Sequence, residues 1–374
     1  MKIFIIGAYP RSLINFRGQL ISLLVGFGWH VTSLSSGANV EEIKSIKNLG
    51  SDYIDYKVKR NGLNPFNDIN TLISFFCILK RNSPDVILAY TIKPIIWGGI
   101  AARLLKHNNF NALITGLGYA FQSGGFFKNI LVFIVVNLYR IALKNAKSVI
   151  FQNHDNMNLF IDKGIVDKSK CYVVNGSGVD LKHFKLTSLT KEPNFLLIAR
   201  LLGDKGIREY VKAAKLIKGK YPNALFELVG PEDPSIDGIT IDRVNKWTDS
   251  GYIQYKGSSN DVRPFIKKCN IFVLPSYHEG MPRTVLEAMA MGRPILTTDV
   301  PGCRETVMNG ENGWLVEKAN FEQLAERMIW FIENQDQWKV MGQKSYSIAN
   351  EKFDVHKVNA EILKIMGISN EKTF

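Results

Sequence analysis

The 374-residue chain has few cysteines and lacks the usual sequence motifs of metal sites. Its four cysteines lie far apart, with no Cys-x-x-Cys and no cysteine–histidine cluster: Cys77, Cys171, Cys269 and Cys303. We therefore expect reduced, packed cysteines in a cytoplasmic compartment rather than a disulfide scaffold. Because no Asp-x-Asp, His-x-x-x-His or Glu-x-x-His occurs, a Mg²⁺ or Zn²⁺ centre is not expected. The absence of a Gly-x-Ser-x-Gly elbow gives no support to serine hydrolase chemistry.

Long hydrophobic runs are also absent. The run at residues 1–7 is too short for a signal peptide and reads as a first strand. The uncharged run Ile130–Tyr139 has about half the length of a membrane span. Residues 126–147 therefore predict either a buried interdomain helix or a helix whose apolar side touches a bilayer surface, with basic residues near its ends.

Positive charge is concentrated in the first half of the chain. The net charge is +13, and residues 1–175 hold 20 Lys/Arg against 9 Asp/Glu, or +11. The remaining residues are nearly neutral, with 27 against 25, or +2. This asymmetry indicates that the first half meets an anionic partner such as an anionic membrane surface or a diphosphate. No nucleic-acid-binding module is recognisable, so nucleic acid is not an expected partner.

Short apolar strands alternate with amphipathic helical stretches in both halves. This pattern predicts an α/β protein with two doubly wound, Rossmann-like domains facing each other across a cleft, residues 1–175 and 176–374. A polar segment at 175–193 separates them, and the last helix is a candidate to pack back on the first domain. Strands are expected at 3–6, 31–34, 53–56, 86–89, 112–115, 149–151, 172–174, 195–199, 225–229, 253–255, 271–274 and 295–297. Helices are expected at 16–27, 68–81, 95–106 and 128–147.

The most informative stretch is residues 275–296, where a strand ends and a helix begins. Glu279 and Glu287 have seven residues between them. Pro282 suits the first helical position, which places Glu279 in the loop and Glu287 between one and two turns inside the helix. The unpaired N–H groups of a helix start can receive an anion. A carboxylate on either side of such a start suits a nucleotide sugar, which has hydroxyls at both ends and a diphosphate between them. The alternative is that the two carboxylates are buried and serve only to cap and pack the helix.

A second informative feature is a pair of cations that follows the first strand of the second half. Arg200 comes directly after this strand, and Lys205 lies five residues on, at the expected start of a helix. Two fixed cations there suit a diphosphate and its neutralisation as a leaving group. Solvated surface cations are the alternative.

Together these motifs resemble the retaining glycosyltransferases of family 4, which have the two-domain GT-B fold. The resemblance covers nearly the whole chain and is strongest at Arg200–Lys205, residues 274–297 and residues 175–180. Three further segments resemble a bacterial branch of this family: Phe16-Arg17, residues 115–119 and residues 298–305. Members of that branch extend polyprenyl-diphosphate-linked saccharides of O-antigen, capsule or N-glycan precursors.

The resemblance implies roles for residues of the second half and for Gly7. Glu279 would lie at the reacting face of the donor sugar, and Glu287 would bind the ribose hydroxyls. Arg200 and Lys205 would hold the diphosphate. Backbone N–H groups of Gly280, Met281 and the neighbours of Pro282 would contact sugar and phosphate, although Pro282 has no N–H to donate. Gly7, after the first strand, would allow close approach to the phosphates.

For the acceptor diphosphate, the resemblance suggests Arg17 and Lys93. Many family members also carry a histidine after a central strand of the first domain, where this chain has Ile114-Thr-Gly-Leu-Gly-Tyr119. Lys93, Thr115 or Tyr119 would fill part of that space.

The resulting prediction is a metal-independent hexosyl- or N-acetylhexosaminyltransferase. It uses a UDP-sugar without any further cofactor, forms an α-linkage on a polyprenyl-diphosphate-linked acceptor, and is peripherally associated with the cytoplasmic face of the inner membrane. Two alternatives remain open at this stage: a UDP-sugar 2-epimerase of the same architecture, and a non-catalytic protein that binds a membrane surface.

Overall fold

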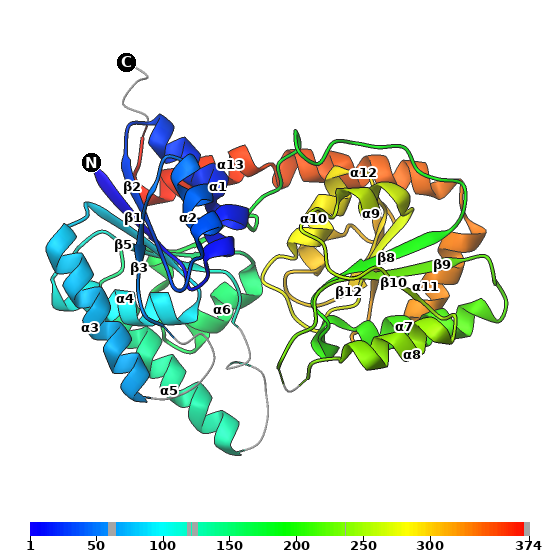
Figure 1. The fold of residues 1–374 in the computed structure, drawn as a ribbon, viewed down its shortest axis with the longest axis horizontal. Coiled ribbons are helices and arrows are strands. Elements are labelled where there is room, and N and C mark those ends of the chain that lie inside the picture. The colour runs from blue at the N-terminus through cyan, green and yellow to red at the C-terminus, as the bar shows by residue number, and fades with distance from the viewer. Residues whose placement is uncertain (59–64, 118–120, 122–125, 236, 370–374) are drawn as a thin grey trace. The chain divides into compact units, whose positions relative to one another are not determined.

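The computed structural model describes the chain except for residues 59–64, 118–120, 122–125, 236 and 370–374. It divides into two compact units (Figure 1). Unit 1 contains Met1–Ser177 and Val358–Phe374, and unit 2 contains Gly178–Lys357. The chain therefore leaves unit 1 once, completes unit 2, and returns.

Unit 1 is built on seven parallel strands in the order β3-β2-β1-β4-β5-β6-β7. The strands are β1 (Lys2–Ile6), β2 (His30–Ser35), β3 (Asp52–Asp55), β4 (Val86–Tyr90), β5 (Phe110–Ile114), β6 (Ser148–Phe151) and β7 (Cys171–Val173). The helices are α1 (Pro10–Gly26), α2 (Val40–Asn48), α3 (Pro65–Asn82), α4 (Ile92–Leu104), α5 (Phe126–Leu143), α6 (His154–Asp162) and α13 (Val355–Met366), with the 3₁₀ turn η2 (Lys168–Lys170).

Alternate side chains of each strand point to opposite faces, and both faces are covered. Ile3 and Ile5 of β1 pack with α1, α2 and α13 on one face. Phe4 and Ile6 pack with α3, α4, α5 and α6 on the other. A strand buried on both faces is apolar at every position, which explains the continuous apolar runs of the sequence.

Unit 2 repeats this plan with six parallel strands in the order β10-β9-β8-β11-β12-β13. The strands are β8 (Asn194–Ile198), β9 (Leu225–Val229), β10 (Gln254–Tyr255), β11 (Ile271–Leu274), β12 (Ile295–Thr298) and β13 (Gly313–Val316). The helices are α7 (Ile207–Lys218), α8 (Ile241–Asp249), α9 (Arg263–Lys268), α10 (Arg283–Ala290), α11 (Phe321–Glu333) and α12 (Gln337–Lys352), with 3₁₀ turns η3 (Gly203–Lys205) and η4 (Arg304–Thr306). Helices α7, α8 and α11 cover one face, and α9, α10 and α12 cover the other (Figure 1).

The doubly wound prediction is confirmed for both units, with differences in detail. All twelve expected strands form, within two residues at either end, whereas β13 was not predicted. Cys269 and Cys303 are buried as expected, but Cys77 is exposed, so the expectation of packed cysteines is wrong at that position. No helix in the described part of the chain is long and apolar enough to cross a membrane.

Helix α5 is not buried on all sides. Val135, Val136 and Tyr139 pack into the core of unit 1. On the opposite side, Phe133 is 68% exposed, and three isoleucines are exposed beside it: Ile130, Ile134 and Ile141. Within unit 1 this helix is therefore buried on one side only, and its other face carries an apolar stripe.

Candidate functional site

The candidate site of unit 2 lies where the order of its strands reverses. Strands β8 and β11 are neighbours at the centre of the sheet, and the chain proceeds outward from them in opposite directions. In open parallel sheets, ligands bind at the carboxyl ends of the strands at such a switch point. The loop after β8 carries Lys205, and the loop after β11 carries Glu279.

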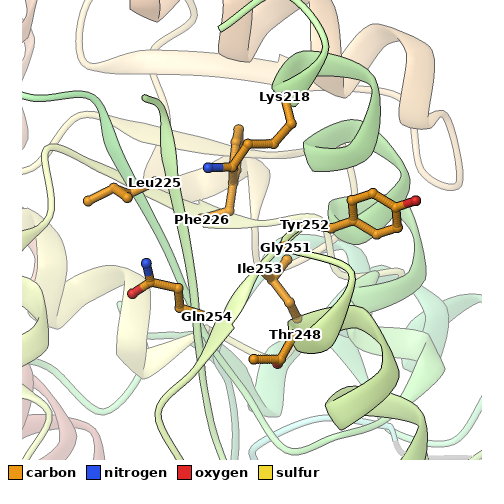
Figure 2. Close-up of a pocket in the computed structure, with 8 residues that line it drawn as sticks. All are labelled: Lys218, Leu225, Phe226, Thr248, Gly251, Tyr252, Ile253 and Gln254. Atoms are coloured by element: carbon orange, nitrogen blue, oxygen red, sulfur yellow. The ribbon is translucent and has the colours of Figure 1, made fainter. Parts of the chain in front are cut away.

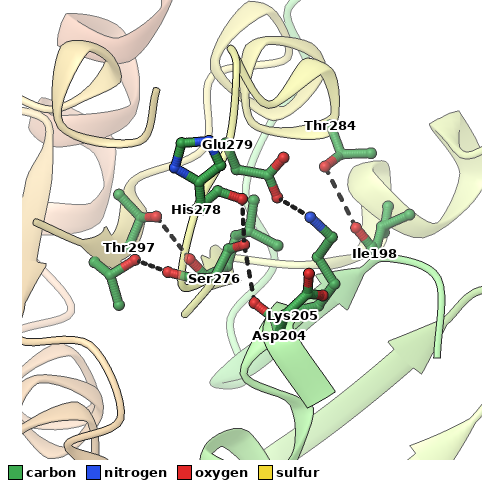
Figure 3. A network of polar contacts seen from close by, with 10 residues as sticks. Ile198, Asp204, Lys205, Ser276, His278, Glu279, Thr284 and Thr297 are labelled. Atoms are coloured by element: carbon green, nitrogen blue, oxygen red, sulfur yellow. Dashed lines mark hydrogen bonds and ion pairs between the residues drawn. The ribbon is translucent and has the colours of Figure 1, made fainter. Parts of the chain in front are cut away.

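These two side chains form an ion pair, which the sequence alone did not predict. Lys205 Nζ lies 2.7 Å from Glu279 Oε1, and both side chains are largely buried, at 14% and 18% exposed (Figure 3). Burial lowers the pKa of Lys205, but the attraction and hydrogen bond of Glu279 outweigh this, so the pKa is raised overall. Lys205 is therefore a fixed cation over the whole neutral range.

Asp204 adds a second carboxyl group beside this pair. Burial raises its pKa, and the positive charge of Lys205 partly opposes the rise. Its Oδ1 is buried and makes no hydrogen bond to any other described residue. No sequence signal distinguished this aspartate from an ordinary residue of a turn.

Backbone contacts join the loops that carry Lys205 and Glu279. The Tyr277 N–H donates to the Asp204 carbonyl at 2.8 Å. The Ser276 hydroxyl donates to the same carbonyl at 3.2 Å (Figure 3). Gly206 has φ +69°, and a Cβ there would lie 2.0 Å from the carbonyl oxygen of Pro275. The two loops therefore interlock closely enough that only glycine fits at position 206.

The helix start after Glu279 lies one residue later than predicted. Helix α10 begins at Arg283, and Pro282 is its N-cap residue rather than its first helical residue. Gly280 and Met281 are half-buried in the loop before it. The prediction that Glu287 lies between one and two turns inside the helix is confirmed.

Glu287 is buried and paired within its own helix. Its Oε1 lies 2.8 Å from Nε of Arg283, one turn earlier. Burial raises the pKa of Glu287 to about 7, and the Arg283 guanidinium limits the rise. Its carboxyl group is therefore half protonated near neutrality.

Arg200 and Lys205 take different partners. Arg200 forms an ion pair with Asp233 and is half exposed. Lys205 is the last residue of η3 and lies two residues before α7, so it stands slightly before the helix start at which it was expected. Sequence reasoning missed Asp233, which lies 33 residues beyond its partner.

In unit 1, Gly7 has a packing role. A Cβ at Gly7 would lie 2.3 Å from the ring of Tyr90, so the glycine makes room for this aromatic side chain. Arg17 is buried, with its guanidinium carbon 5.2 Å from the centroid of the same ring. Arg17 is therefore not accessible to a diphosphate in this structure.

The other predicted acceptor residues are Lys93, Thr115 and Tyr119. Lys93 Nζ lies 2.8 Å from Asp68 Oδ1, and both side chains are 17% exposed. Thr115 is half-buried just after β5. Tyr119 lies outside the described residues.

A cavity of about 220 Å³ lies at the opposite end of the unit 2 sheet (Figure 2). Its lining includes Leu225 and Gln254, the first residues of β9 and β10, so it opens at the amino ends of these strands. The lining is mainly apolar. It is therefore separate from the Lys205–Glu279 site.

Two family descriptions match the chain. Residues 179–348 match "Glycosyl transferases group 1", and residues 19–153 match "Glycosyl transferase 4-like". Among solved structures, a glycosyltransferase from Rickettsia africae superposes with a TM-score of 0.78 at 21% identity, covering 98% of this chain and 97% of that one. The fold is thus that of the GT-B glycosyltransferases.

Two relatives of known activity are similar to the chain over most of its length. The chain is 31% identical over 309 residues to the N,N'-diacetylbacillosaminyl-diphospho-undecaprenol α-1,3-N-acetylgalactosaminyltransferase of Campylobacter jejuni, covering 79% of this chain and 80% of the relative. It is 27% identical over 305 residues to the UDP-Gal:α-D-GlcNAc-diphosphoundecaprenol α-1,3-galactosyltransferase of Escherichia coli, covering 75% and 76%. The chain belongs to the group 1, family-4-type glycosyltransferases.

Proposed function

We propose that this enzyme transfers a hexose or N-acetylhexosamine from a UDP-sugar to a saccharide carried on polyprenyl diphosphate, with retention and an α-linkage. The printed activities of the two relatives support the acceptor class, because both act on a saccharide linked to diphosphoundecaprenol. The Escherichia coli relative supports the donor class, because its name specifies UDP-galactose. Both names also specify an α-1,3 linkage.

The observation that carries this proposal is the Lys205–Glu279 pair at the switch point of unit 2. A diphosphate placed beside Lys205 meets a cation that is already desolvated and fixed, so charge developing on the leaving group is stabilised without rearrangement of the site. Arg200 adds a second cation from the same loop. Glu279 then faces the donor sugar, with the Gly280 and Met281 backbone beside it, and Glu287 accepts hydrogen bonds from the ribose hydroxyls.

The reaction needs no metal in this proposal, because Lys205 and Arg200 supply the positive charge. No group of three or more potential metal ligands occurs within the described ranges. We expect transfer to persist at more than half its rate after treatment with EDTA. Loss of activity that Mg²⁺ restores would contradict the cation-only account.

The proposal also places the enzyme at the cytoplasmic face of the inner membrane, where its lipid-linked acceptor resides. The apolar stripe of α5, made up of Ile130, Phe133, Ile134 and Ile141, supports this. Exposed Arg140 and Lys144 lie on the same helix or directly after it. Exposed apolar side chains flanked by cations suit an anionic lipid surface.

The test is a donor screen followed by substitution of Glu279. We expect one UDP-sugar to raise the melting temperature of the protein and to be transferred to a synthetic polyprenyl-diphosphate-linked saccharide. Glu279→Gln should reduce transfer by at least about 100-fold, as removal of an electrostatic catalytic group does, while the protein remains folded. Near-normal transfer by Glu279→Gln would refute the role given to this residue.

Glu311→Gln is a matched control for the loss of an ion pair. Glu311 also lies 2.7 Å from a lysine, Lys344, but this pair is half exposed and lies outside the candidate site. We expect it to retain transfer within about twofold, because exposed pairs contribute little to stability.

A further inference from the structure

The turn that follows β12 packs against the backbone of Glu279. The Glu279 N–H donates to the carbonyl of Pro301 at 3.2 Å. Gly302 has φ +84°, and a Cβ there would lie 2.6 Å from the Glu279 carbonyl oxygen and 2.7 Å from that of Gly280. The turn therefore touches the Glu279–Gly280 backbone so closely that position 302 has no space for a side chain.

A carboxylate holds this turn in shape. The Gly302 N–H donates to Glu305 Oε2 at 2.8 Å. Cys303, between these two residues, is fully buried, and its N–H donates to the Val300 carbonyl at 3.1 Å. The turn is thus fixed at its centre by Glu305 and anchored by a buried side chain.

The opposite side of the same loop is fixed by the segment after β8. Tyr277 and Ser276 donate to the Asp204 carbonyl, as described above, and Lys205 pairs with the Glu279 carboxylate. The Thr298 hydroxyl, at the end of β12, donates to the Ser276 carbonyl. The loop that carries Glu279 is therefore held between the ends of β8 and β12, its neighbours on either side in the sheet order.

We propose that the turn Val300–Glu305 positions Glu279 for sugar transfer, with Gly302 and Glu305 as positioning residues. Glu305 acts through the Gly302 N–H, and the turn acts through the Glu279–Gly280 backbone. This inference rests on the proposed function, because it assigns the turn to the transfer step. Reactivity depends steeply on such placement, since displacements of about 1 Å reduce rates by about 100-fold.

Two glycine variants separate positioning from backbone strain. Gly302→Ala and Gly310→Ala introduce a Cβ at the same φ, +84°, but the nearest atom to a Cβ at Gly310 is a ring carbon of Trp314 at 3.6 Å. We expect Gly302→Ala to lower kcat by about 30-fold or more, with the Kd of the UDP-sugar within about threefold of wild type. Gly310→Ala should keep kcat within about twofold. Equal kcat values for the two variants would overturn the proposal.

The Glu305 variants provide a second readout that does not depend on the folding of Gly302→Ala. Glu305→Ala removes the acceptor for the Gly302 N–H, whereas Glu305→Gln keeps an oxygen there. We expect kcat to fall by about tenfold in Glu305→Ala and to return to within about threefold of wild type in Glu305→Gln. An unchanged kcat in Glu305→Ala would contradict the proposed role.

The outcome for the wild type tests the proposed function separately. If the wild-type enzyme transfers sugar but the Gly302 and Glu305 variants match their controls, only the positioning role is wrong. If the wild type transfers no sugar from any donor, the proposed function fails, and the positioning role fails with it.

Discussion

Among single residues, Glu287 has a carboxyl group whose charge changes within the neutral pH range. Its pKa is about 7 in the folded protein, against an ordinary value of 4.5. Between these values the folded state holds a proton that the unfolded state has released. The free energy of unfolding therefore falls as pH rises from about 4.5 to 7, by about 3 kcal/mol at 1.36 kcal/mol per pKa unit, and this contribution is constant above pH 7.

Glu287→Gln should remove this pH dependence. We expect the variant to match wild type near pH 5 and to be more stable than wild type at pH 8, because only the wild type then buries an ionised carboxylate. Loss of the attraction to Arg283 reduces the gain. Urea unfolding at both pH values measures the difference in stability between the variant and the wild type. If this difference favours the variant less at pH 8 than at pH 5, the raised pKa is contradicted.

Donor binding should have the opposite pH dependence if Glu287 binds the ribose as proposed. Ribose hydroxyls donate to the ionised carboxylate, so the affinity for a UDP-sugar should rise by about fivefold between pH 6 and pH 7, by about tenfold between pH 6 and pH 8, and level off above pH 8. The diphosphate of a UDP-sugar has no group that titrates there. Isothermal titration calorimetry measures the profile, and Glu287→Gln should flatten it.

The sequence indicated several individual site residues but not their contacts. Glu279 and Lys205 were each assigned to the donor site, yet they are 74 residues apart. Their pairing depends on β8 and β11 being adjacent, and sequence periodicity does not reveal strand order. The Arg200–Asp233 pair was missed for the same reason.

At the level of elements, α5 makes a specific prediction about lipid binding. Replacing both Phe133 and Ile134 with serine should weaken binding to vesicles of phosphatidylglycerol and phosphatidylcholine by at least about tenfold, because each buried large apolar side chain contributes about 2 kcal/mol. Co-sedimentation with vesicles measures this. Val40→Ser is the control, since Val40 is 82% exposed on another helix, α2. Equal losses in the two proteins would contradict the role of α5.

Most strands could be predicted because each is a short apolar run between polar turns. Strand β13 (Gly313–Val316) was not, since it begins with a glycine, which is disfavoured in strands. Pairing with β12 makes it a strand, and this tertiary contact overrides its weak local signal. The start of α10 was misplaced by one residue because the extended backbone of Pro282 suits an N-cap as well as a proline-initiated turn.

At the level of the whole molecule, the return of the chain to unit 1 predicts where core mutations act. Ile362 of α13 is buried in unit 1, whereas Ile348 of α12 is buried in unit 2. Each isoleucine-to-alanine change should cost about 2–5 kcal/mol. We expect Ile362→Ala to accelerate hydrogen exchange in β1 and β4, and Ile348→Ala in β11 and β12. The reverse pattern would contradict the assignment of these helices to the two units.

The two ends of unit 2 lie side by side. The Val179 N–H donates to the Phe353 carbonyl at 2.7 Å, and the Val355 N–H donates back to the Val179 carbonyl at 3.1 Å. Unit 2 is in this respect an insertion within unit 1, which imposes an order on folding during synthesis. The ribosome completes unit 2 while the sheet face that α1, α2 and α13 cover still lacks α13. A chaperone that shields nascent apolar surface should therefore stay bound to residues 1–177 until α13 has emerged.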